Sequence, residues 1–126
     1  VMKGRGLLTQ IIVPVPHERT SVAYQTLTLR EAMDLSIVSA AASIYKERGI
    51  IKKAVIVLGA VAPVPVRARK AEKVLVRTKG TERAIEESAA LAPESCAPIT
   101  DVRASEEYRR EMVSVVTRRV LKEVLS

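Results

Sequence analysis

The stretch SIVSAAASIYKERGIIKKAVIVLGAV, residues 36–61, decides the fold, because it can be interpreted either as helix or as a β-hairpin. Its alanines and the good helix formers before it favour one helix over residues 30–48 by propensity alone. Yet residues 36–45 also alternate, with Ile37 and Tyr45 on one side and Val38 and Ile44 on the other. Gly49 then supplies a turn, and residues 51–61 are β-rich. We therefore predict a brief helical turn at residues 31–34, followed by a hairpin.

Upstream of the hairpin, two further segments have β character. Residues 22–29 alternate β-branched, aromatic and small polar side chains, which predicts a strand. Residues 7–13 form a β-branched run that Pro14 and Pro16 terminate. Because proline has no N–H for a β-ladder, this run is expected to be an edge strand. A linker that carries His17, the only histidine, joins the two.

The rest of the chain is predicted to be helical. One helix is expected over residues 68–76, and a second begins after Thr81 as N-cap and runs to about Leu91, before Pro93. A third begins after Ser105 as N-cap. Its expected apolar stripe is Tyr108, Met112, Val116, Val120 and Val124. Strands followed by helices predict an α+β fold in which helices cover one face of an antiparallel sheet.

Composition limits the classes of function. The 126 residues suit one domain, and the core must be aliphatic because there is no Trp or Phe and only three Tyr. The net charge of +7 comes from scattered basic residues that no aromatic side chains interleave, so we expect no nucleic acid partner. No apolar run has membrane-spanning length. A single cysteine, Cys96, fits a reducing cytoplasm.

Candidates for catalysis are scarce. His17 is expected to be a solvated linker residue, and Cys96 a small, buried side chain at a helix end. The five glycines give no Rossmann or Walker spacing, and no metal-ligand spacing exists. The residues alone therefore predict an α+β domain with no catalytic residue and no metal site.

Three strings carry a resemblance to a known family. They are AYQ (23–25) with REAMDLSIVSAA (30–41), LGAVAPVPVRA (58–68) with Glu72 after it, and PITDVRASEEYRR (98–110). In this order and spacing they resemble the C-terminal domain of the FAD-binding (medium) subunit of the xanthine dehydrogenase and carbon monoxide dehydrogenase family, the molybdenum hydroxylases. The resemblance implies a three-stranded antiparallel sheet packed with a three-helix bundle. It also implies that residues 1–20 are an edge strand and linker from a preceding FAD domain, and residues 21–126 the C-terminal domain.

The resemblance also implies a function. The family's flavin subunit takes electrons from a molybdopterin subunit through an iron–sulfur subunit and passes them on from FAD. This chain would be part of an FAD-dependent oxidoreductase. It would complete the FAD environment and dock to those partners, while the upstream domains hold the FAD pyrophosphate. The chain alone is therefore not expected to bind FAD tightly or to be catalytic.

By the same resemblance, two residues approach the cofactor. Leu35 would make an apolar contact to the flavin ring, and Lys52 would bring positive charge near a reduced flavin or the FAD phosphates. Thr26 stands where many relatives carry lysine, a change that we expect to alter the flavin potential. Arg30 and Asp34 flank the same turn, and we interpret them as an ion pair that holds Leu35 in place.

An alternative function and one physical consequence remain open. The alternative is a stand-alone basic interaction module, binding protein or nucleic acid, without redox activity. If residues 7–13 normally pair with an upstream domain, an apolar patch is exposed in this chain. Because such patches promote association, we expect some self-association.

Overall fold

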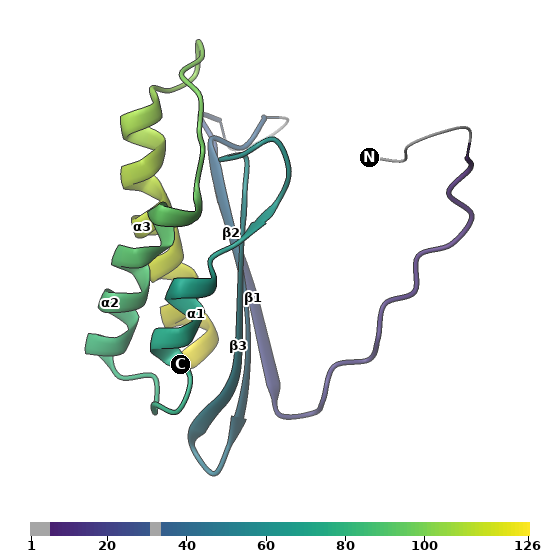
Figure 1. Cartoon of the computed structure of the whole chain (residues 1–126), viewed down its shortest axis with the longest axis vertical. Helices are drawn as coiled ribbons and strands as arrows, with labels where there is room; N and C mark the ends of the chain where they lie inside the picture. The colour runs from purple at the N-terminus through teal and green to yellow at the C-terminus, as the bar shows by residue number, and fades with distance from the viewer. Residues whose placement is uncertain (1–5, 31–33) are drawn as a thin grey trace.

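The computed structural model describes residues 6–30 and 34–126. Four strands form one antiparallel sheet in the order β1-β2-β3-β4 (Figure 1). They are β1 (Thr20–Leu27), β2 (Val38–Glu47), β3 (Ile50–Gly59) and β4 (Val66–Arg67). The predicted hairpin is confirmed, and the two-residue β4 is added to the three strands that were expected. The helical turn predicted at residues 31–34 includes residues outside the described part of the chain.

The β2–β3 hairpin forms despite the helix propensity of its alanines. Arg48 and Gly49 both have positive φ, 51° and 77°, the signature of the two-residue turn that suits the twist of paired strands. Alternate residues of β2, from Val38 to Ile44, are buried toward the helices, and Ala42 pairs with Ile56 of β3. Burial of one strand face thus outweighs the local preference for helix.

The helices lie on one face of this sheet (Figure 1). They are α1 (Arg69–Leu75), α2 (Glu82–Leu91), the 3-10 helix η1 (Ala92–Ser95) and α3 (Glu106–Leu125). Both predicted N-caps are confirmed, because the Thr81 hydroxyl accepts the Ala84 N–H and the Ser105 hydroxyl accepts the Tyr108 N–H. No helix in the described residues is long and apolar enough to cross a membrane.

The buried face of α3 differs from the predicted stripe in its first turns. Val116, Val120 and Val124 are buried as expected, but Tyr108 is exposed. Arg109 and Val113 are buried on this face instead. A four-residue step advances about 40° beyond a full turn, so a strict spacing of four drifts around the helix. Because of this drift, the predicted stripe did not include Arg109, which is buried.

A carboxylate completes the edge of β3 where β4 is short. The Ile56 N–H donates to Glu72 Oε1 at 2.9 Å. Arg67 of β4 binds both oxygens of this carboxylate, at 2.6 and 2.7 Å. Glu72 is 7% exposed, so α1 delivers a buried charge to the sheet edge and pairs it there.

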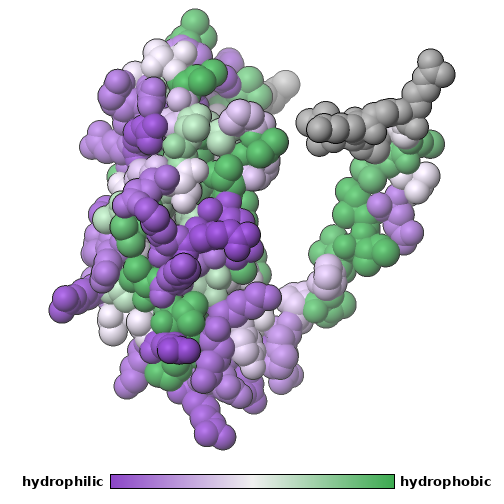
Figure 2. All heavy atoms as spheres, in the orientation of Figure 1, coloured by the Kyte–Doolittle hydropathy of each residue, from purple (hydrophilic) through white to green (hydrophobic). Residues whose placement is uncertain are grey.

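Residues 6–13 extend away from the sheet, on the side opposite the helices (Figure 1), whereas His17 packs against Tyr45 of β2 and the Arg19 carbonyl accepts the Lys46 N–H at 3.3 Å. The edge strand predicted at residues 7–13 does not form within the described chain, because no strand lies beside it to accept its backbone hydrogen bonds. Its apolar side chains are exposed, and Figure 2 shows them gathered along this arm. They are Leu7, Leu8, Ile11, Ile12, Val13 and Val15.

Candidate functional site

The loop between β1 and β2 presents Leu35, the first predicted cofactor contact. The Asp34 carboxylate accepts the Arg30 N–H at 2.8 Å and the Leu35 N–H at 2.7 Å. Desolvation alone would raise the pKa of Asp34, but these backbone donors outweigh it and lower the pKa below its usual value. Arg30 and Asp34 were expected to form an ion pair, but Asp34 contacts the backbone N–H of Arg30 instead. Among the ion pairs of the described residues, none joins the Arg30 guanidinium to the Asp34 carboxylate within 4.0 Å.

Leu35 itself is 67% exposed and borders a pocket of about 600 Å³. The apolar part of the lining comes from three separate segments: Leu35, Ala60, Ala62, Pro63, Pro98 and Ile99. Beside it, the Thr26 and Ser36 hydroxyls hydrogen-bond at 2.8 Å. This end of the sheet therefore offers an exposed apolar side chain beside a concave, mostly apolar surface, a feature of small-molecule sites.

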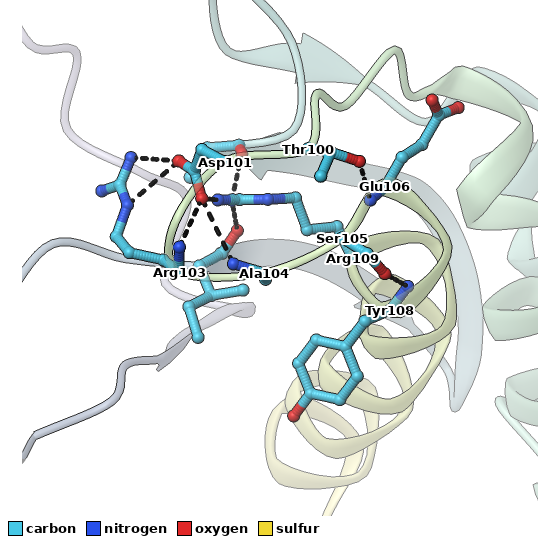
Figure 3. A network of polar contacts seen from close by, with 10 residues as sticks. Thr100, Asp101, Arg103, Ala104, Ser105, Glu106, Tyr108 and Arg109 are labelled. Atoms are coloured by element: carbon cyan, nitrogen blue, oxygen red, sulfur yellow. Dashed lines mark hydrogen bonds and ion pairs between the residues drawn. The ribbon is translucent and has the colours of Figure 1, made fainter.

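The polar part of the pocket is a network centred on Asp101 (Figure 3). Its carboxylate accepts from the Arg103 side chain at 2.6 and 3.1 Å and from Arg109 Nη2 at 2.8 Å. The backbone N–H groups of Arg103 and Ala104 also donate to it. These donors, the Arg103 side chain foremost, hold the pKa of Asp101 far below its usual value. The carboxylate is therefore a fixed negative charge between two guanidinium groups.

Arg109 reaches across the molecule from the first turn of α3. Only 2% exposed, it donates through Nη1 to the backbone carbonyl of Ile37 at 2.6 Å and to that of Ala60 at 3.3 Å. Sequence analysis missed this residue. The sequence carried no direct signal for it, because Arg109 lies four residues before Val113, and only the structure shows that this face of α3 is buried.

Lys52, the second predicted contact, lies at the other end of the hairpin. It is the residue that the register skips in a β-bulge, since Tyr45 pairs with Lys53 and Lys46 with Ile51. Its ammonium is 4.0 Å from Glu47 Oε2, and the side chain is half exposed. Gly59, the last residue of β3 at the Leu35 end, lies seven residues after Lys52, about 23 Å away at the usual rise per residue. The structure therefore does not bring Leu35 and Lys52 together.

The residues considered for catalysis do not assemble. His17 is exposed, accepts the Arg19 N–H at 3.2 Å, and packs edge-on against Tyr45. Cys96 is buried as predicted, and burial raises its pKa to about 11, which suppresses the reactive thiolate. No group of three or more His, Cys, Asp or Glu side chains in the described ranges could hold a metal ion. The geometry supports binding and positioning.

Comparison with known proteins gives concordant matches. A family model described as the CO dehydrogenase flavoprotein C-terminal domain matches residues 22–124. The carbon monoxide dehydrogenase medium chain of Afipia carboxidovorans is 37% identical over 115 residues, which cover 91% of this chain and 40% of that protein. The xanthine dehydrogenase FAD-binding subunit of Escherichia coli O157:H7 is 26% identical over 113 residues, 90% and 39% of the two chains.

A solved structure agrees in fold. The reconstituted CO dehydrogenase from Oligotropha carboxidovorans superposes with a TM-score of 0.82 at 34% identity, over 90% of this chain and 39% of that one. The chain thus spans about 40% of the length of the curated relatives that it matches.

Proposed function

This chain belongs to the family of CO dehydrogenase flavoprotein C-terminal domains, and on that premise we propose that it forms one wall of the FAD site in a complete oxidoreductase subunit. The observation that carries the proposal is Leu35, an exposed apolar side chain that borders a pocket and whose backbone N–H is bound by Asp34. Bound FAD supplies the electron-transfer chemistry, and this chain supplies shape and contacts.

The two predicted contact residues, Leu35 and Lys52, are not equally well placed to contact FAD. Leu35 can lie against the flat apolar face of a ring, and the neighbouring Thr26–Ser36 pair leaves its hydroxyl groups engaged with each other. Lys52 is too far from Leu35 to act on the same group, so its charge would act on a remote part of an extended cofactor or on a neighbouring domain. Leu35 is therefore the stronger candidate for a flavin contact.

The rest of the FAD site belongs to other parts of the subunit in this proposal. Residues 1–20 would be a strand and linker from a preceding FAD domain, and residues 21–126 the C-terminal domain. The exposed apolar arm supports this division, because pairing with an upstream sheet would bury side chains that now face solvent. Without an upstream phosphate cradle, this chain alone would not hold FAD tightly.

The assembly that we propose follows the family resemblance. An iron–sulfur subunit and a molybdopterin subunit would deliver electrons to the flavin, in a cytoplasmic enzyme. The alternative of a stand-alone basic module rests on the net charge of +7 alone, and part of the basic surface is paired with acids: Lys70 with Glu94, Arg118 with Glu86, and Lys122 with Glu82. Such pairing lowers the positive potential that an acidic partner would need.

Leu35→Ala in the complete subunit tests the proposal. We expect the flavin absorption spectrum and midpoint potential to change, because the ring loses its apolar neighbour and gains water. Val22→Ala is a matched control, since Val22 is an equally exposed aliphatic residue on β1. Unchanged flavin properties in Leu35→Ala would overturn the proposal.

Two further variants test the neighbouring positions. Thr26→Lys introduces an ammonium group at the position where the family resemblance leads us to expect a lysine, and it should raise the flavin midpoint potential by stabilising the reduced anion. No shift would show that Thr26 does not influence the flavin. Lys52→Ala should weaken FAD retention more than Lys53→Ala, its exposed neighbour in the same strand. Equal retention in the two variants would remove Lys52 from the site.

A further inference from the structure

We infer that Arg109 is a positioning residue for the Leu35 contact: one buried guanidinium fixes the three loops around the pocket. The inference rests on the proposed function and adds a residue that lies outside the proposed cofactor contacts. Arg109 would act through the backbone carbonyls of Ile37 and Ala60. Ile37 lies two residues after Leu35, and Ala60 lies two residues before Ala62, and both Leu35 and Ala62 line the pocket.

The contacts of Arg109 are arranged to join separate segments. Nη1 donates to Ile37, two residues after Leu35, and to Ala60, directly after β3. Nη2 donates to Asp101, in the loop before α3. All three loops border the same pocket. A shift of this guanidinium would therefore move the pocket walls relative to one another.

Ala60 gives an independent reason for expecting the loop to depend on Arg109. Its φ is +62°, a left-handed conformation that an alanine adopts at a cost in free energy. Such a conformation persists only where surrounding contacts enforce it. The Arg109 hydrogen bond to the Ala60 carbonyl is one of these contacts. The backbone beside the pocket is thus maintained by a tertiary contact and not by local preference.

The chemistry of the site also argues against a simple packing role. A buried charge is costly, and a hydrophobic residue of similar volume often stabilises a core as well or better. The Arg109 Nε is buried and has no hydrogen-bond partner in the described structure, so the guanidinium is not fully satisfied. Asp101 is held by Arg103 and by two backbone N–H groups, which keeps its carboxylate in place for Arg109. The free-energy cost of burying the Arg109 guanidinium is expected of a residue that fixes the geometry of the loops and does not mainly add stability.

The test uses the complete flavin subunit with Arg109→Met, which keeps apolar volume, and Arg109→Lys, which keeps the charge. Arg110→Met is the control, because Arg110 is adjacent but half exposed and paired with Glu106 one turn away. Two readouts are measured: amide hydrogen exchange by segment, and the flavin spectrum with its midpoint potential. The exchange readout does not depend on the flavin.

We expect Arg109→Met to speed exchange at least about tenfold in segments 34–38 and 60–62, because it removes all three Arg109 hydrogen bonds and the loss of one hydrogen bond to a charged group already corresponds to about that factor. The β2–β3 ladder should keep its protection. The flavin properties should shift in the direction that Leu35→Ala gives, and Arg109→Lys should restore part of both effects. If Arg109→Met does not fold, local loosening and an intermediate flavin shift in Arg109→Lys carry the same support.

Two outcomes would overturn the inference, and a third would overturn the proposed function on which it rests. Faster exchange spread evenly over the sheet would overturn the inference, because it indicates a general structural role. The Arg109 variants could instead speed exchange in these segments and leave the flavin spectrum and midpoint potential unchanged, while Leu35→Ala changes both flavin properties. That result would overturn the inference and leave the proposed function intact. If neither Leu35→Ala nor the Arg109 variants affect the flavin, the proposed function fails, and the exchange pattern still decides whether Arg109 holds the loop.

Discussion

Replacing Glu72 tests how the short edge of the sheet is stabilised. In Glu72→Gln the side-chain carbonyl can still accept the Ile56 N–H, but the charge that Arg67 binds through two hydrogen bonds is lost. In Glu72→Ala both interactions are lost, and the Ile56 N–H is left buried without an acceptor. The two variants therefore separate the ion pair from the backbone contact.

The magnitudes follow from burial. Glu72 is 9% exposed at its side chain and Arg67 40%, so Arg67 regains water when its partner is removed. We expect Glu72→Gln to cost about 1–2 kcal/mol, near the lower range for hydrogen bonds to a charged group. Glu72→Ala should cost about 1–3 kcal/mol more, the penalty for an unsatisfied buried N–H group. Both losses are measurable against the roughly 6–19 kcal/mol expected for 126 residues.

Urea unfolding followed by circular dichroism at pH 7 measures these free energies. Arg67→Gln and the double variant complete a cycle that isolates the pair. Equal stability of Glu72→Gln and Glu72→Ala would refute the role of the Ile56 N–H. A coupling of zero between positions 67 and 72 would refute the role of the ion pair.

The pH dependence gives a second check on Glu72. Burial raises its pKa, but the Arg67 and Ile56 donors outweigh this, and the net pKa is lowered from 4.5. A lowered pKa contributes stability that is fully present above the unfolded value and lost as pH falls through the folded value. The difference in the free energy of unfolding between wild type and Glu72→Gln should therefore be constant near pH 7 and become smaller below pH about 4.5. A difference that widened in acid would contradict this sign.

Three further predictions concern the hairpin, the thiol and the loop network. A methyl group in Gly59→Ala would lie 2.5 Å from Ser39 Oγ, so this variant should lose about 1–2 kcal/mol in urea unfolding. Adding Ser39→Ala should recover most of that loss; equal losses in both backgrounds would contradict the contact. Because burial raises the pKa of Cys96 to about 11, an aromatic disulfide reagent should react at pH 8 about tenfold or more slower with the folded than with the unfolded chain; equal rates would contradict burial. Asp101→Asn should lower the melting temperature at pH 7, and because the pKa of Asp101 is lowered, the difference should narrow only below pH about 3.8; a pH-independent difference would argue against an ionised carboxylate.

Local chemistry determined much of the fold in advance. Alternation predicted the hairpin, and Gly49 predicted its turn, because a positive φ costs glycine little. Thr81 and Ser105 predicted two helix starts, since their hydroxyl groups accept backbone N–H groups within the next turn. Each of these signals acts over a few residues, so it is visible in the sequence.

The family resemblance predicted that Leu35 and Lys52 approach a cofactor, but it did not indicate how far apart the two residues lie. That required the register of β2 against β3, which puts them at opposite ends of the hairpin. The strand expected at residues 7–13 did not form within the described chain for a related reason. A β-strand is stabilised by the strand beside it, and its own sequence does not reveal whether that neighbour is present.

Only the tertiary structure revealed Arg109 and Glu72 as buried charges. Arg109 meets the Ile37 carbonyl 72 residues away, and Glu72 meets the Ile56 N–H 16 residues away. The sequence by itself determined an α+β domain with an aliphatic core and few catalytic groups. Which charges that core would bury depended on packing, because a buried charge is tolerated only where segments distant in sequence bring it partners.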